Sequence, residues 1–162
     1  MNFIQLLQQE WNQELAITQK MLNAIPENFD WKPHEKSMSL GRLATHVAEI
    51  PEWMAVTLDT DVLDFAKGYT PNKPATKAEV LALFDKMSKK SVESLSNLTE
   101  AKMDETWTMR NGDVVYFTLP KAVVMRQFVF SHIVHHRAQL GVYLRILGIP
   151  VPGTYGPSAD ES

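Results

Sequence analysis

Residues 120–148 read PKAVVMRQFVFSHIVHHRAQLGVYLRILG, and this stretch decides the fold that we expect. Its apolar residues recur at steps of three and four, which is the spacing of one face of an α-helix. Pro120 suits the first turn of such a helix, and Gly148 is typical of the residue just past its end. The stretch therefore predicts a long amphipathic helix over about 120–147. Its core-facing stripe consists of Met125, Val129, His132, His136, Leu140, Tyr143 and Leu147.

Three upstream segments carry the same spacing of apolar residues. They predict helices over residues 2–25, about 40–58 and 76–98. Ser39 is a suitable side-chain cap for the second of these helices. Thr76 and Glu79 have the spacing of a capping box at the start of the third. Pro51 falls inside the second helix, where we expect it to kink the helix or to break it locally.

The segments between the predicted helices are of two kinds. Residues 26–38 and 59–75 contain proline or glycine and are interpreted as connectors. Residues 107–119 instead place β-branched and aromatic runs on either side of Asn111-Gly112, which is a strong signal for a β-hairpin. The sequence thus predicts an all-α fold, a four-helix bundle with long connectors and one short β-hairpin before the last helix. Its length fits one domain over 1–162.

Composition excludes several classes of protein. The chain has 162 residues, no cysteine and a net charge of −3. Thiolate metal sites, disulfides and a cysteine nucleophile are therefore excluded. A mildly acidic chain argues against nucleic acid as a partner, since that needs clustered Lys and Arg. The first residues resemble no secretory signal, and no apolar run is long enough to cross a bilayer, so we expect a cytoplasmic protein without membrane contact.

The histidines are the residues with the clearest chemical meaning. His132 and His136 are four residues apart, so on a helix they lie one turn apart on the same face. Two imidazoles so placed can converge on one cation. His46, halfway along the predicted second helix, is the best candidate for a third ligand. Glu49 follows it by one turn and either orients a ligand or faces solvent.

A metal-free interpretation of the same residues stays open. Histidines in a helix core can be hydrogen-bonded without binding a metal. His135 belongs to the neighbouring row of the last helix, so we prefer His132 and His136 as ligands. His34 falls in a loop and is interpreted as structural or superficial. The carboxylates of Glu35, Glu49 and Asp160 could act as acid–base groups, but solvated carboxylates are far commoner.

Two longer segments identify a family resemblance. FDWKPHEKSMSLGRLATHVAE (29–49) and FSHIVHHRAQLGVYLRILGIPVPGTYGPSADE (130–161) resemble the DinB-like family, the DNA-damage-inducible proteins related to YfiT. The resemblance covers nearly the whole chain. It implies a four-helix bundle with a metal site near one end, and it places the three ligands on His46, His132 and His136. It also implies a homodimer, for which Trp53 could serve as an interface residue, although a core role fits it equally well.

The chemistry expected of such a site follows from its ligands. Three neutral imidazoles leave at least one coordination position open, as in catalytic metal sites. The ion would be zinc, nickel or iron, and copper also suits imidazole ligands. Relatives of the fold include S-transferases and an isomerase that use bacillithiol or mycothiol. The resemblance thus implies a metal-dependent enzyme that transfers a low-molecular-weight thiol to a small electrophilic substrate. Metal-dependent hydrolysis and a non-catalytic, stress-response metal-binding role are the alternatives.

The sequence assigns no catalytic residue beyond the ligands. Arg137 and Gln139 follow the last histidine and either support the ligand helix or are exposed, and exposure is the simpler expectation. In the C-terminal tail, Tyr155, Ser158 and Asp160 either line the mouth of the site or attach the tail to the helices. For Ser158 we expect attachment.

Overall fold

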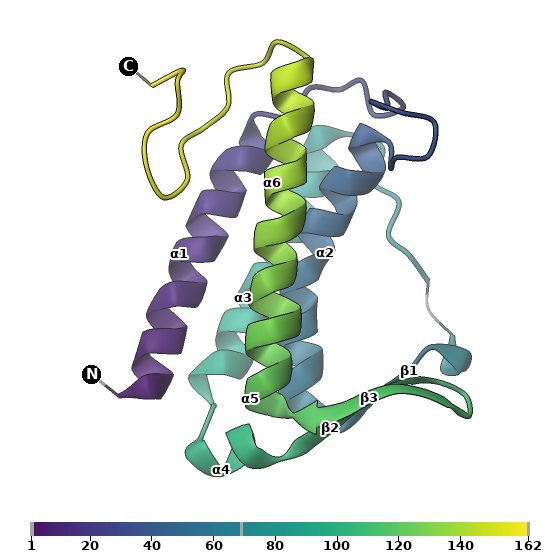
Figure 1. Ribbon diagram of the computed structural model, residues 1–162, viewed down its shortest axis with the longest axis vertical. Coiled ribbons are helices and arrows are strands. Elements are labelled where there is room, and N and C mark those ends of the chain that lie inside the picture. Colours follow the sequence, from purple (N-terminus) through teal and green to yellow (C-terminus); the bar gives the residue numbers. More distant parts are fainter. Residues whose placement is uncertain (1, 69, 162) are drawn as a thin grey trace.

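The computed structural model describes residues 2–68 and 70–161. Long helices dominate it and run side by side (Figure 1). In the described residues these are α1 (Phe3–Asn23), α2 (Leu40–Asp59), α3 (Lys77–Ser96) and α6 (Ser131–Ile146). Helix α2 packs against α3 and α6, and α1 packs against the same two helices. None of the described helices combines the length and the apolar character that a membrane span needs.

Side-chain caps fix where the helices begin, as the sequence predicts. The Ser39 hydroxyl accepts a hydrogen bond from the Arg42 amide at the start of α2, and the Thr76 hydroxyl accepts one from the Glu79 amide at the start of α3. The Glu79 carboxylate reaches back to the amide of Ala75, one residue before the cap. These bonds satisfy amide donors that the first turn of a helix leaves free.

The order of the helices differs from a simple up-and-down arrangement. In Figure 1, α1 and α6 rise toward the top of the view, whereas α2 and α3 both descend. Residues 70–76 lead the chain back toward the top of the view, where α3 begins. We expected Pro51 to kink α2 or to break it locally, and it does not break the helix, which continues from Leu40 to Asp59. The four-helix-bundle topology itself stays a prediction.

The predicted hairpin is confirmed, but it belongs to a larger sheet. Strands β2 (Thr106–Asn111) and β3 (Val114–Pro120) pair antiparallel, with Gly112 and Asp113 at the tip. The tip thus lies one residue beyond the expected Asn111-Gly112, and Gly112 supplies the positive φ of 59°. A further strand, β1 (Val62–Asp64), pairs parallel with β2. The expected all-α class is therefore wrong in this part, and the fold is mostly helical with a small three-stranded sheet.

Asp64 fastens the short strand β1 to the hairpin. Its carboxylate accepts hydrogen bonds from the amides of Ala66 and Gly112, at 3.1 and 2.9 Å, and lies 3.0 Å from the Arg110 guanidinium. The Gly112 bond is the main cause of a lowered pKa for this carboxyl. Asp64 also caps the following 3-10 turn, η1 (Phe65–Lys67), through its bond to the Ala66 amide.

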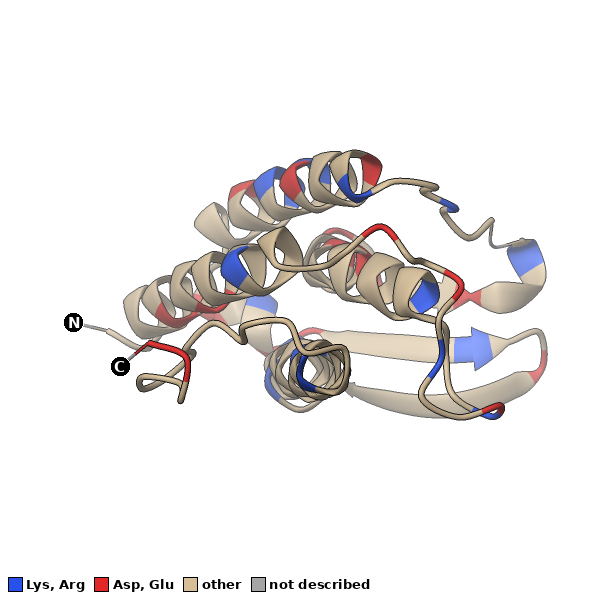
Figure 2. Cartoon of the chain, turned by 90° about the horizontal axis from the view of Figure 1, so that it is seen from above, with Lys and Arg blue, Asp and Glu red and all other residues tan. Residues whose placement is uncertain are grey.

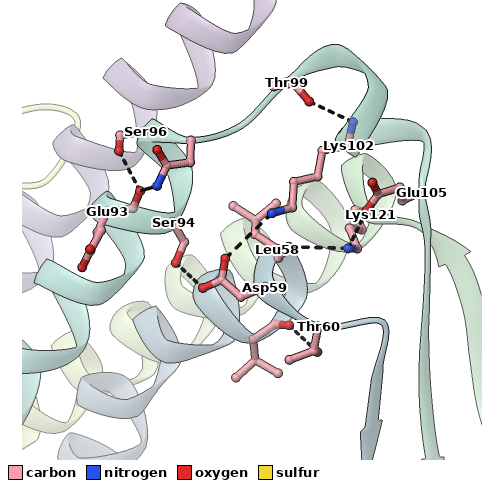
Figure 3. Close-up of polar contacts among 12 residues, drawn as sticks. Leu58, Asp59, Thr60, Glu93, Ser94, Ser96, Thr99, Lys102, Glu105 and Lys121 are labelled. Carbon is pink, nitrogen blue, oxygen red and sulfur yellow. Dashed lines mark hydrogen bonds and ion pairs between the residues drawn. The ribbon is translucent and has the colours of Figure 1, made fainter.

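Polar contacts close the end of the molecule where the helices meet the sheet (Figure 3). Asp59 accepts a hydrogen bond from Ser94 and lies 4.0 Å from the Lys102 ammonium. The buried Lys121 donates to the Glu105 carboxylate at 2.8 Å and to the Leu58 carbonyl. These contacts join α2, α3 and α4 (Glu100–Asp104) to the start of the last helical segment. Elsewhere, Figure 2 shows basic and acidic residues interspersed along the helices.

The helical segment that carries the histidines is not a uniform α-helix. It begins with α5 (Lys121–Val123), continues as a π-helical stretch, η2 (Val124–Phe130), and then becomes α6. The Ser131 hydroxyl donates to the Arg126 carbonyl, five residues earlier, as this wider turn allows. A π-helical turn adds residues to the turn and so rotates the face that follows. The buried row of α6 consists of Ile133, Arg137, Leu140, Tyr143 and Leu144.

Candidate metal centre

The rotation of α6 places its histidines at the edge of the core rather than in its middle. His132 and His136 are half-buried and face α2, where His46 is also half-buried. One ligand atom from each of the three rings lies within 4.8 Å of the others. The Nε2 atoms of His46 and His132 are 3.1 Å apart. The structure thus brings together the three histidines that the sequence singled out.

The outer nitrogens of the rings have unequal partners. His136 Nδ1 lies 2.7 Å from the Gln139 amide oxygen, which can only accept, so this nitrogen carries the proton and leaves Nε2 free as an acceptor. His46 Nδ1 is 4.0 Å from the Glu49 carboxylate. His132 Nδ1 is buried and has no hydrogen-bond partner among the described residues. The outer nitrogen of His136 therefore has a hydrogen-bond partner, whereas that of His132 has none among the described residues.

Burial keeps the imidazoles in their neutral form. Burial, with a smaller contribution from the neighbouring histidines, lowers the pKa of His46 and of His132 to about 4. The pKa of His136 is also lowered, mainly by burial and against the opposing effect of Gln139. Because only a neutral imidazole can bind a metal, the group is in the required form at neutral pH.

Glu49 connects the histidine group with the long connector after the sheet. Its side chain is only 5% exposed. One carboxylate oxygen accepts from the Arg42 guanidinium at 3.2 Å, and the other accepts from both the amide and the side chain of Asn72. Of the two roles that the sequence left open for Glu49, solvent exposure is therefore wrong. Asn72 has no signal of its own in the sequence, because its role depends on a contact with Glu49 across 23 residues. The sequence analysis also did not single out Arg42, which lies seven residues before Glu49 on the same helix.

The donor set can be tested against what a cation requires. Two nitrogens that are each about 2.0–2.1 Å from one ion can be at most about 4.2 Å apart. The 3.1 Å between His46 and His132 lies well inside this limit. Any pair near the upper value of 4.8 Å would need one ring to turn slightly. Without a cation, the two facing nitrogens share one proton at most, and three uncharged imidazoles gather for no evident structural gain. The residues fit a divalent metal ion.

The other histidines lie outside this group. His135 is exposed, with its ring centroid 4.7 Å from that of His136, and it is not part of the group that could hold an ion. His34 is exposed in its loop, where its Nδ1 accepts from the Lys36 amide. The expectations for both residues agree with these positions.

Arg137 is buried, so our expectation that it is exposed is wrong. Its side chain is 2% exposed and lies 2.6 Å from the Glu14 carboxylate on α1. It also donates to the Thr18 hydroxyl and to the Tyr155 hydroxyl, and Tyr155 in turn donates to Glu14. A buried guanidinium needs such a partner, and Glu14 on a mostly polar helix gave no signal of being one. Gln139, by contrast, is exposed as expected, and its side-chain oxygen also contacts the His136 ring.

The tail residues attach the tail and do not line the histidine group. Tyr155 contacts Arg137 and Glu14, and Asp160 forms two bonds with the Arg145 guanidinium and accepts from the Val151 amide. The Ser158 hydroxyl accepts from the Asp160 amide within the tail. In Figure 1 the tail lies beside α6 on the side of α1, away from α2.

Two cavities lie along the α2 face that carries His46. An apolar cavity of about 190 Å³ lies toward the sheet and includes Trp53 and Phe65. An open cavity of about 760 Å³ lies toward the other end, between residues 27–31 and 72–75, and includes Arg42. Trp53 packs against Phe65 and Phe128, and the homodimer for which it was considered stays a prediction.

Comparisons with known proteins agree with the resemblance seen in the sequence. The DinB family model matches residues 1–162. The chain is 29% identical over 157 residues to the uncharacterized protein YrdA of Bacillus subtilis strain 168, which covers 93% of this chain and 87% of that protein. Two crystal structures of DinB-like proteins share the fold. One, from Bacillus cereus, has a TM-score of 0.70 at 23% identity and covers 92% of this chain and 95% of its own. The other, YjoA from Bacillus subtilis, has a TM-score of 0.67 at 20% identity, with 89% and 94% covered.

Proposed function

The chain belongs to the DinB family, and from this premise and the geometry of its histidines we propose that it is a metal-dependent enzyme. His46, His132 and His136 hold one divalent ion. The observation that carries the proposal is the convergence of three neutral imidazoles from two separate helices, with 3.1 Å between two facing nitrogens.

The chemistry available to such a centre is the activation of a nucleophile. When bound, a divalent ion lowers the pKa of a thiol or water in its open coordination position and so supplies a nucleophile at neutral pH. The protein's own residues fix the rings. Gln139 holds His136 in the tautomer with a free Nε2, and Glu49 stands behind His46. Outer partners of this kind orient metal ligands and hold their tautomers.

We propose thiol transfer as the reaction. The sulfur of a low-molecular-weight thiol forms a bond to an electrophilic carbon, the leaving group departs with the bonding electron pair, and the thiol proton passes to solvent. Because the chain has no cysteine, the reacting sulfur must come from a cosubstrate. The two cavities on the α2 face support this proposal, since a thiol and an electrophile need separate places next to one centre.

Metal content is the first test. Protein purified without a His-tag and reconstituted with zinc is expected to hold about one ion per chain, measured by elemental analysis after dialysis. His46→Ala and His136→Ala should each reduce the content to a small fraction of that value. His135→Ala is the matched control, because it removes an exposed imidazole next to His136 and should leave the content unchanged. Equal content in all four proteins would refute the centre.

Activity is the second test. The metal-loaded protein, supplied with a small thiol and an electrophile such as monobromobimane, should form the thioether faster than the His46→Ala variant does. Turnover of esters or amides without added thiol would favour hydrolysis instead. If ligand substitution changes stability alone and none of these substrates turns over, the protein is a non-catalytic metal-binding protein.

A further inference from the structure

A small apolar cavity beside the histidine group has the features of a substrate subsite. Its volume is about 190 Å³. Its lining consists of Glu49, Glu52, Trp53, Val56, Leu63 and Phe65. Helix α2, strand β1 and turn η1 each contribute to it, so the cavity exists only because the sheet is folded against the helices.

Aromatic rings connect this cavity with the histidines. The ring centroids of Trp53 and Phe128 are 5.2 Å apart and meet edge to face, and Phe128 is likewise 5.2 Å from the His132 ring. Trp53 also follows His46 by seven residues on α2, which places both side chains on the same face of the helix. A ligand in the cavity would therefore lie one aromatic side chain away from the histidine group.

Buried residues pack against the outer side of the residues that line the cavity. Trp53, Val56, Leu63 and Phe65 all pack against a second hydrophobic cluster of the buried residues Trp107, Met109 and Val124. Asp64 fixes the two lining residues that flank it through its bonds to Ala66 and Gly112. A cavity so supported is largely formed before a ligand arrives, which reduces the ordering cost of binding.

Size and charge define what the cavity can take. An apolar cavity of about 150 Å³ is known to bind benzene, so this one has room for a single ring of that size. Its described lining contains two carboxylates and no basic residue. Arg42 and Lys90 pair with these two carboxylates from outside the lining, so an anionic substituent on the ring would find no cation of its own in the cavity, whereas an uncharged ring can pack against Trp53 and Phe65.

We propose that this cavity binds one uncharged, benzene-sized ring of the substrate and presents the rest of that molecule to His46, His132 and His136. The inference rests on the proposed function for the reaction that follows, but ring binding needs no metal. The ring-binding proposal and the proposed function can therefore be refuted separately.

The experiment follows the indole signals of the metal-free protein by ¹⁵N NMR during titration with benzyl alcohol and, separately, with benzoate at pH 7. The Trp53 signal, assigned with Trp53→Phe, should shift saturably with benzyl alcohol. Benzoate should bind at least about tenfold more weakly. The indole of Trp11 is the internal reference, because its hydrogen bond to Ser91 holds it and it is not among the residues that pack around the cavity.

Two variants from different elements fill the cavity, so that the failure of one to fold does not decide the result. Val56→Phe and Leu63→Trp should each weaken benzyl alcohol binding by at least about tenfold. Val92→Phe adds the same ring on α3, outside the described cavity lining, and should bind as the parent does. The proposal is overturned if Trp53 shows no saturable shift, if benzoate binds equally well, or if a folded cavity variant binds unchanged. A protein that binds the ring but no zinc would refute the proposed function alone.

Discussion

Helix α6 carries polar side chains on two faces, and these side chains differ in whether all their polar atoms have hydrogen-bond partners. On the face toward α1, the buried Arg137 has a carboxylate partner and two hydroxyl partners. On the face toward α2, the imidazoles have one another, and His132 Nδ1 has no hydrogen-bond partner among the described residues. Buried polar groups normally have hydrogen-bond partners, so a structural role is enough to explain the Arg137 network. A buried group that lacks a partner, such as His132 Nδ1, needs another explanation. The comparison separates a structural ion pair from a candidate site within a single helix.

Breaking the Arg137 network should have the largest effect on stability. Arg137→Met leaves the Glu14 carboxylate buried without its cation, and the loss of one partner of a buried pair typically costs about 3–5 kcal/mol. We expect a decrease of this size in the free energy of unfolding, measured by urea denaturation. Zinc content should stay at one ion per chain, because this face does not contribute ligands.

A surface pair provides the matched control for burial. Lys89 and Asp85 are 2.7 Å apart, close to the 2.6 Å of Arg137 and Glu14, but their side chains are 76% and 59% exposed. Lys89→Met should change the free energy of unfolding by no more than about 0.5 kcal/mol. Similar losses in the two variants would contradict our distinction between the pairs.

The imidazole face should make the metal-free protein sensitive to acid. The folded-state pKa of His46 and of His132 is about 4, below the ordinary 6.5. Below pH 6.5 the unfolded chain therefore binds protons that the folded one does not, and stability falls as the pH decreases toward 4. Each such group contributes at most about 3 kcal/mol, because solvent around the half-exposed rings screens part of the effect. Urea denaturation after treatment with EDTA should show this decline between pH 6.5 and 4.

The His132→Gln variant tests the source of that decline, because it cannot take up the proton. Its stability should depend less steeply on pH over the same interval. A slope equal to that of the parent protein would assign the acid sensitivity to other groups.

The smallest effect is expected from a change at Glu49, the carboxylate next to the outer nitrogen of His46. Glu49→Gln keeps the size of the side chain and an acceptor for Asn72 but removes the negative charge near the ring. Loss of an outer partner typically weakens metal binding about 10–100-fold. Competition with a zinc chelator measures the change. Glu52→Gln is the control, since that carboxylate pairs with Lys90, and unchanged affinity in Glu49→Gln would remove Glu49 from the centre.

Local patterns predicted the helices well. The side chains of Ser39 and Thr76 cap the helices they were expected to cap, and Asn111-Gly112 marked the hairpin to within one residue. Such signals depend on neighbouring residues alone, which is why one sequence suffices to recognise them. Strand β1 was missed because three residues carry no periodicity and it pairs with residues 46 positions later.

The same distinction applies to the site. The four-residue spacing of His132 and His136 indicated a shared face, and the family resemblance placed His46 with them. The sequence could not place Arg137, which is buried only because Glu14 and Tyr155 lie opposite it. Nor could it show the π-helical turn before Ser131, which rotates α6 and sets the histidines at the edge of the core.

Residue type and local spacing were enough to identify which residues are chemically capable of binding a metal and which segments are helical. Only the tertiary structure showed that Glu49 and Gln139 lie next to the outer nitrogens of His46 and His136, and that aromatic side chains from α2 and η1 line a cavity nearby. The physical reason is that these arrangements depend on how the helices and the sheet pack together. Their energy comes from packing and burial that no local pattern records.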